Sequence, residues 1–252
     1  MKFSRKRSEP EEQSSEAPSE STGETPESEA APEVTGVRAN GPWDIAEVEI
    51  DEDDPNRLDL GSLVVTPREG LDIQLQVDEQ SGQVVAVVMA GQEGAVELRA
   101  FAAPRNGDIW PDVRHQIAAE VTRRGGTATE AEGPYGTELR VVMNVTAPDG
   151  RTGQQPSRVF GIAGPRWLLR ATLFGKPALE PTEDGLVESA LRDVVVRRGG
   201  DPHAPGDALP LVVPQAVAQQ MQAAQQQAQQ QAQQQAQQQA QQASPDRRTL
   251  DT

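Results

Sequence analysis

The sequence predicts an α+β domain: a mainly antiparallel sheet with two helices packed on it, flanked by disordered tails. Three observations support this fold class. Seven of the eight aromatic residues lie within residues 43–199. Several segments of that stretch alternate apolar and polar side chains, which is typical of strands with one buried face. Two further segments carry apolar residues at helical spacing.

The strand pattern recurs along the core. Apolar and polar residues alternate over 71–77, 96–100 and 139–145, whereas 84–89 is a continuous apolar run that indicates a central strand. Two more strands are expected at 159–163 and 167–173. The turns at Gly164-Pro165, Ser81-Gly82 and Asp149-Gly150 are short, and short connections favour antiparallel neighbours.

Two helices are expected. The first covers about residues 111–124, since Pro111 suits the first helical position and Gly125-Gly126 suits its end. Its apolar stripe consists of Trp110, Val113, Ile117 and Val121. The second covers about 183–197, with Thr182 as its N-cap. Its buried face consists of Val187, Leu191 and Val194.

Composition divides the chain into four parts. Residues 1–42 contain no Leu or Ile and carry a run of Glu and Pro, which predicts a disordered acidic tail. Residues 43–199 form the core domain. The four prolines of 200–214 indicate a stiff linker. Residues 215–252 are Gln- and Ala-rich and are expected to be helical or disordered, with self-association through this segment as an alternative.

The residue counts exclude several kinds of chemistry. The chain has no Cys, which rules out disulfides, Cys-ligated zinc and iron–sulfur clusters, and its two His cannot form a His-rich metal site. We therefore expect no cofactor. The net charge of −16 disfavours nucleic acid as a partner. No apolar run is long enough for a membrane span, and no apolar segment follows the basic residues 2–7, so we expect a cytoplasmic protein.

Four side chains are candidates for ligand binding. Arg166 and Arg170 are expected on one face of a strand, where they could hold a phosphate or carboxylate. The competing interpretation is an ion-pair ladder with Glu138 or Glu97. His115 is expected on the outer face of the first helix, and Tyr135 in a turn, as an exposed contact.

The acids of residues 44–54 lack the spacing of an EF-hand loop. We interpret them as solvated charges or as a mimic of a polyanion. Trp167 is expected in the core, on the opposite face of its strand from the two arginines.

Five blocks carry a resemblance to a known family: Gly41–Asp44, Leu58–Leu63, Trp110–Arg114, Gly133–Leu139 and Gly164–Arg170. In these blocks the chain resembles an uncharacterised actinobacterial family, the domain of unknown function DUF3710. The resemblance implies no established activity and no known catalytic residues. The order of strands and helices also resembles the topology of the PsbP-like sandwich, a fold used mostly for non-catalytic binding.

Two functions remain open. The first is a non-catalytic protein-interaction or scaffold module with an unknown protein partner, because a compact core with long tails suits an adaptor. The alternative is a binder, or an enzyme, that acts on a small anionic ligand through Arg166 and Arg170, with His115 as a further contact. The residues contain no arrangement typical of a nucleophile with its base, so we do not expect catalysis.

Overall fold

The computed structural model describes residues 38–51, 54, 56–146, 150–182 and 184–214. The predictions for the Gln- and Ala-rich segment 215–252, for residues 1–37 of the acidic tail and for the turn at Asp149 concern residues outside these ranges. Everything below refers to the described residues.

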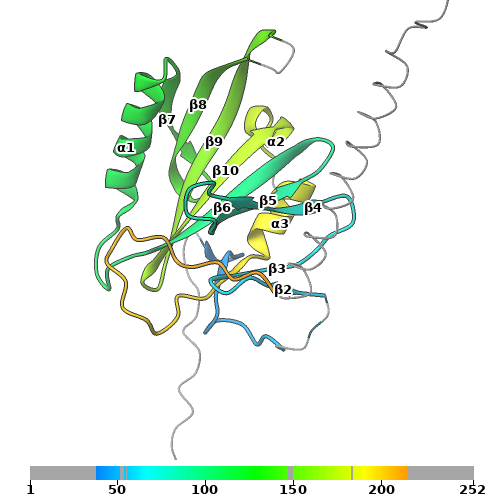
Figure 1. Cartoon of the computed structure of the whole chain (residues 1–252), viewed down its shortest axis with the longest axis vertical. Helices are drawn as coiled ribbons and strands as arrows, with labels where there is room; N and C mark the ends of the chain where they lie inside the picture. The colour runs from blue at the N-terminus through cyan, green and yellow to red at the C-terminus, as the bar shows by residue number, and fades with distance from the viewer. Residues whose placement is uncertain (1–37, 52–53, 55, 147–149, 183, 215–252) are drawn as a thin grey trace, which may run out of the picture. The chain divides into compact units, whose positions relative to one another are not determined.

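A seven-stranded antiparallel sheet forms the centre of the domain (Figure 1). Its strands in spatial order are β4 (Asp72–Val77), β5 (Val84–Ala90), β6 (Gly94–Ala102), β10 (Trp167–Gly175), β9 (Thr152–Gly164), β8 (Gly136–Thr146) and β7 (Thr127–Gly133). The six predicted strands are all present, and the fold class is confirmed. Sequence analysis missed β7, because its apolar positions are only Ala128 and Ala131.

A smaller sheet of four short strands lies across one face of the large one. In spatial order these strands are β1 (Trp43–Asp44), β11 (Val195–Val196), β3 (Leu63–Val65) and β2 (Leu58–Asp59). The β1–β11 pair is parallel, and the other two pairs are antiparallel. Strands of two or three residues carry no periodicity, so sequence analysis did not find them.

The described residues contain three helices, α1 (Trp110–Arg123), α2 (Lys176–Leu179) and α3 (Leu186–Arg192). The first helix lies within one residue of the prediction. The predicted second helix is wrong over its last turn, because α3 ends at Arg192 and Val195–Val196 become strand β11. Its N-cap is Gly185 rather than Thr182. The β-branched run 194–196 favours an extended backbone, and pairing with β1 and β3 buries it.

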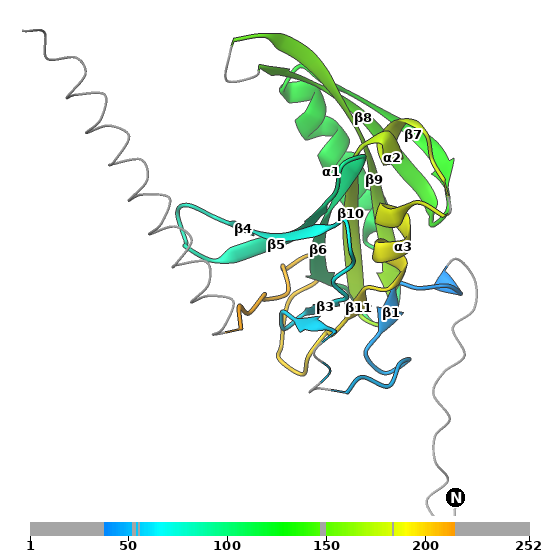
Figure 2. The same ribbon diagram turned by 90° about the vertical axis from the view of Figure 1, so that its right-hand side faces the viewer.

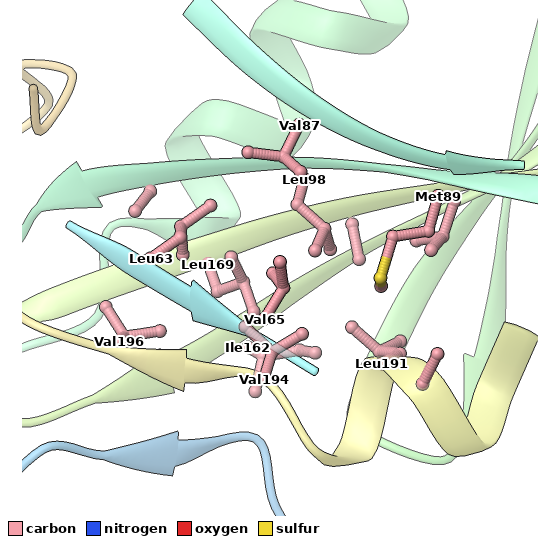
Figure 3. Packing of buried hydrophobic residues seen from close by; sticks show 14 of the residues in the cluster. Leu63, Val65, Val87, Met89, Leu98, Ile162, Leu169, Leu191, Val194 and Val196 are labelled. Carbon is pink, nitrogen blue, oxygen red and sulfur yellow. The ribbon is translucent and has the colours of Figure 1, made fainter. Parts of the chain in front are cut away.

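Each face of the large sheet has its own apolar core. On one face, Figure 3 shows side chains of β3, β11 and α3 packed against β5, β6, β9 and β10. On the other face, α1 packs over β7, β8 and β9. Trp110 begins this helix and lies directly on Gly161 of β9, where a Cβ would come within 2.0 Å of the indole ring. Gly161 therefore sets how closely α1 approaches the sheet.

Trp167 joins the two sheets. Its side chain is fully buried, and its indole N–H donates a 2.6 Å hydrogen bond to the carboxylate of Asp44 in β1. The guanidinium of Arg38 lies 5.1 Å from the centre of the indole ring and forms a double hydrogen bond with Glu47. Trp167 is thus in the core, as expected.

The same contacts correct two expectations. Residues 38–42 belong to the domain rather than to the acidic tail 1–42, since Arg38 is buried against Glu47. Asp44 and Glu47 are not solvated acids of the 44–54 cluster, because the folded chain surrounds both carboxylates with donors. The indole partner of Asp44, Trp167, lies 123 residues further along the chain, too far for sequence spacing to reveal it.

The proline-rich stretch 200–214 is not a free linker. Leu209 is buried in the larger core, and its N–H donates to the carbonyl of Ala100. Ala208 bridges to Phe101, and Leu211 bridges to Gly61. Apolar side chains between the prolines therefore attach this stretch to both sheets, along the end of β6.

The Trp167–Asp44 bond predicts a large stability effect. Asp44→Ala leaves the buried indole N–H without an acceptor, so we expect the free energy of unfolding to fall by about 3 kcal/mol. Urea denaturation followed by tryptophan fluorescence measures it. Glu49→Ala is the matched control, because Glu49 is exposed and the charge change is the same. Equal losses in the two variants would contradict the proposed role of the bond.

Candidate functional site

A groove of about 970 Å³ lies between α1 and strands β6, β8, β9 and β10 of the large sheet. We call it the α1 groove. Its apolar lining comes from both walls: Phe101, Ile117, Val121, Val141, Met143 and Val159. Its charged lining includes Arg99, Arg170, Arg123, Arg124, Asp112 and Glu120. The groove therefore combines an apolar interior with several arginines.

Two of these arginines lie directly opposite each other. Arg99 of β6 pairs in register with Arg170 of β10, and both side chains line the groove. Like charges at directly opposed positions of a sheet repel each other. A single carboxylate, Glu97, lies near both: its Oε1 is 2.8 Å from Nε of Arg99 and 3.8 Å from an Nη of Arg170. One negative charge thus faces two positive charges.

The surroundings of Arg170 make its charge costly. Its guanidinium lies 5.4 Å from the centre of the Phe101 ring. Burial, and secondarily the positive charge of Arg99, lower the pKa of Arg170 from its ordinary value, while Glu97 partly opposes the shift. An arginine stays protonated at neutral pH even so. The site therefore holds a partly desolvated cation that a bound anion would stabilise.

A second basic group lies at the carboxyl end of α1. Arg123 and Arg124 both form ion pairs with Glu120. Their side chains are 74% and 69% exposed, so these pairs contribute little to stability and both guanidinium groups remain available to a ligand.

The structure separates the two predicted arginines. Arg170 lies on β10, but Arg166 lies in the exposed turn before that strand, with a φ of 62°, and it does not line the α1 groove. The ion-pair interpretation applies to Arg170 through Glu97. Glu138, the other expected partner, is fully buried and pairs instead with Arg158 and, at 3.3 Å, with Arg140.

His115 and Tyr135 lie elsewhere. His115 is exposed on α1 and does not line the groove. Tyr135 occupies the predicted turn, between β7 and β8, but it is half-buried rather than exposed. Its ring packs edge-on against Phe160 at 5.7 Å. Burial raises the pKa of the Tyr135 hydroxyl, and the charge of Arg192 partly offsets the shift.

Sequence reasoning missed Arg99, although a signal was present. Arg99 and Glu97 alternate with apolar residues along β6, which placed both on the outer face of that strand. Which strand pairs with β6, and in which register, depends on non-local contacts. Sequence analysis therefore could not set Arg99 opposite Arg170.

Within the ranges that the structure covers, no group of three or more His, Cys, Asp or Glu side chains is arranged to hold a metal ion. In the same residues, no helix has the length and apolar character required to cross a membrane.

Comparisons with known proteins give one clear match. The profile of a family described as "Protein of unknown function (DUF3710)" matches residues 41–220. A search of curated proteins finds no match. Among solved structures, a protein from Bacteroides thetaiotaomicron is similar at 8% identity and a TM-score of 0.31, over 56% of this chain and 47% of that one, so the chain spans about half of it. The solution structure of cyanobacterial PsbP from Synechocystis is similar at 10% identity and a TM-score of 0.33, over 59% of this chain and 98% of that one.

The position of Tyr135 predicts its titration. The chain contains one tyrosine, so phenolate absorbance reports this residue alone. We expect a midpoint above the ordinary 10.0 in the folded protein and a return to it in urea. Because the Tyr135 pKa is higher in the folded than in the unfolded protein, the neutral hydroxyl adds to the free energy of unfolding below pH 10. This contribution disappears as the pH rises through the folded pKa. Tyr135→Phe should therefore flatten the stability profile above pH 10. A folded midpoint at or below 10.0 would disprove the burial argument.

Proposed function

The chain belongs to the DUF3710 family of proteins of unknown function, and we propose that its domain is a non-catalytic interaction module that binds an acidic segment of a partner protein in the α1 groove. The opposed pair Arg99 and Arg170 is the observation that carries this proposal. Glu97 is the one carboxylate that pairs with both of them among the described residues.

Electrostatics favours an anionic group at this pair. Cβ atoms at opposed positions of an antiparallel pair are about 5 Å apart, close enough for one carboxylate to bridge two guanidinium groups. Hydrogen bonds between ionised groups are stronger than neutral ones, and the apolar lining beside Arg170 reduces competition from water. Binding an anion would also relieve the repulsion between the two arginines.

The shape of the groove favours a polypeptide over a small molecule. Small-molecule sites usually enclose most of their ligand. The α1 groove instead runs beside a helix of 14 residues, about 21 Å long at 1.5 Å per residue, and is open on one side. Its charges form two groups, one on the sheet and one at Arg123 and Arg124. A segment with acidic residues separated by apolar ones matches this pattern.

A small anionic ligand is the second candidate, and the partly desolvated Arg170 favours it. This ligand would need only the sheet arginines, whereas an extended segment would also contact Arg123 and Arg124. The double variant Arg123→Gln/Arg124→Gln separates the two candidates in a binding assay with an acidic peptide. Loss of peptide binding supports the polypeptide. Unchanged peptide binding shows that the sheet arginines suffice, as expected for a small anion.

Binding can be tested with a labelled peptide of alternating Glu and Leu, followed by fluorescence anisotropy. We expect Arg99→Gln and Arg170→Gln each to weaken binding at least tenfold, because losing one charge-assisted contact costs about 1.4 kcal/mol or more. Arg166→Gln is the control with the same charge change, and it should leave the affinity unchanged because Arg166 lies outside the groove. Equal effects of all three variants would refute the site.

Glu97→Gln provides a test in the opposite direction. Glu97 competes with a ligand for both guanidinium groups, so its neutralisation should tighten peptide binding about threefold, the effect of roughly 0.7 kcal/mol for a half-buried ion pair. The same assay measures it, and Glu79→Gln, at an exposed position, is the matched control. Weaker binding by Glu97→Gln would show that Glu97 contributes to the site rather than competing for it.

A further inference from the structure

The large sheet ends in two edge strands with different protection. At one edge, β7 carries Glu130 and Glu132, and Arg114 of α1 forms an ion pair with Glu130. Charges and a covering helix are common means of preventing an edge strand from pairing with another chain. The β7 edge is therefore protected.

The other edge, β4, has less protection. Its six residues contain no Pro and no Lys, and Asp72 is their one charge. On its outer side, no backbone hydrogen bond joins β4 to any described residue. Val77 at its end is 47% exposed. In Figure 2 the β4–β5 hairpin projects from the rest of the sheet.

We propose that two copies of this chain pair through β4, antiparallel and centred on Gln74, to extend the sheet across a two-fold axis. A symmetric dimer uses the same surface on both copies, so the strand must be complementary to itself. In this register Gln74 lies opposite Gln74 of the second copy, Ile73 opposite Leu75, and Asp72 opposite Gln76.

The side chains of β4 favour this register. Ile73 and Leu75 are half-buried and share the face that packs on the larger core, so their pairing places apolar beside apolar. Oε1 of Gln76 accepts a hydrogen bond from Arg99. The Gln76 amide N–H groups are then directed away from that guanidinium and can donate to Asp72 of the second copy.

Neighbouring registers fit less well. With a two-fold axis perpendicular to the sheet, directly opposed residues must point to the same face. Because side chains alternate along a strand, the axis must then pass beside a residue and not between two residues. A centre at Leu75 would place Asp72 opposite Asp78. A centre at Ile73 would pair only three residues of β4. The centre at Gln74 pairs residues 72–76, which is the regular part of the strand, because the register shifts after Gln76.

Such an interface is small, and small interfaces are weak. We therefore expect a dimer that forms at high protein concentration and dissociates on dilution.

Cysteine cross-linking of the full chain tests the register. The chain has no Cys, so Gln74→Cys introduces a single thiol that can form a disulfide only between copies. Opposed Cα atoms are about 4.5–5.5 Å apart, within the range of a disulfide. Gln76→Cys is the matched control. In this register the two copies of position 76 are offset by four residues along the strand, about 13 Å, which is too far for a disulfide.

Under mild oxidation at high concentration, we expect Gln74→Cys to form covalent dimers at least tenfold faster than Gln76→Cys, with equal rates in urea. Equal rates for the folded proteins would overturn the proposal.

Sedimentation velocity distinguishes β4 pairing from association through another segment, such as the Gln- and Ala-rich residues 215–243. Gln74→Lys places two like charges opposite each other and should abolish the dimer, and an unchanged thermal melt would show that the fold is intact. Gln154→Lys, at an exposed position of β9, should leave the dimer unchanged. If both variants associate like the parent chain, or if the parent chain stays monomeric at high concentration, the proposal is wrong.

Discussion

The burial of Trp167 between the two sheets is the constraint on which the rest of the domain depends. The ring fills the space at the start of β10, and Asp44 satisfies its one donor. Side chains alternate along a strand, so the inward position of Trp167 directs Leu169 to the same core and Arg170 to the opposite face. One buried aromatic residue therefore attaches the small sheet and also determines where the arginine lies.

The α1 groove exists because the helix covers only part of the sheet. Trp110 lies on Gly161, which places α1 over β7, β8 and β9 rather than over Arg99 of β6 and Arg170 of β10. The backbone register then holds Arg99 and Arg170 opposite each other, whatever their mutual repulsion, because hydrogen bonds and the buried face determine the pairing. A rigid sheet thus maintains this unfavourable pair of charges, with Glu97 as the one carboxylate near both.

Local patterns predicted the long elements well. Alternation in β4, β6 and β8 and the apolar stripe of α1 follow from burial of one face, which a short window of sequence records. The C-terminal end of the second predicted helix was wrong because a short window of sequence records only local spacing. Helical spacing continues through Val194, and only the pairing of β11 with β1 and β3 ends the helix.

The sequence by itself determined the fold class, the family, the position of six of the seven strands of the large sheet and the side of β10 on which Trp167 lies, because each depends on periodicity or on motifs within short segments. Only the tertiary structure decided that Arg99, and not Arg166, is the neighbour of Arg170. It also decided that Asp44 and Glu47 are interior groups and that 200–214 packs on the domain. These features depend on strand order and on contacts between residues far apart in the chain, and packing of the whole domain selects both.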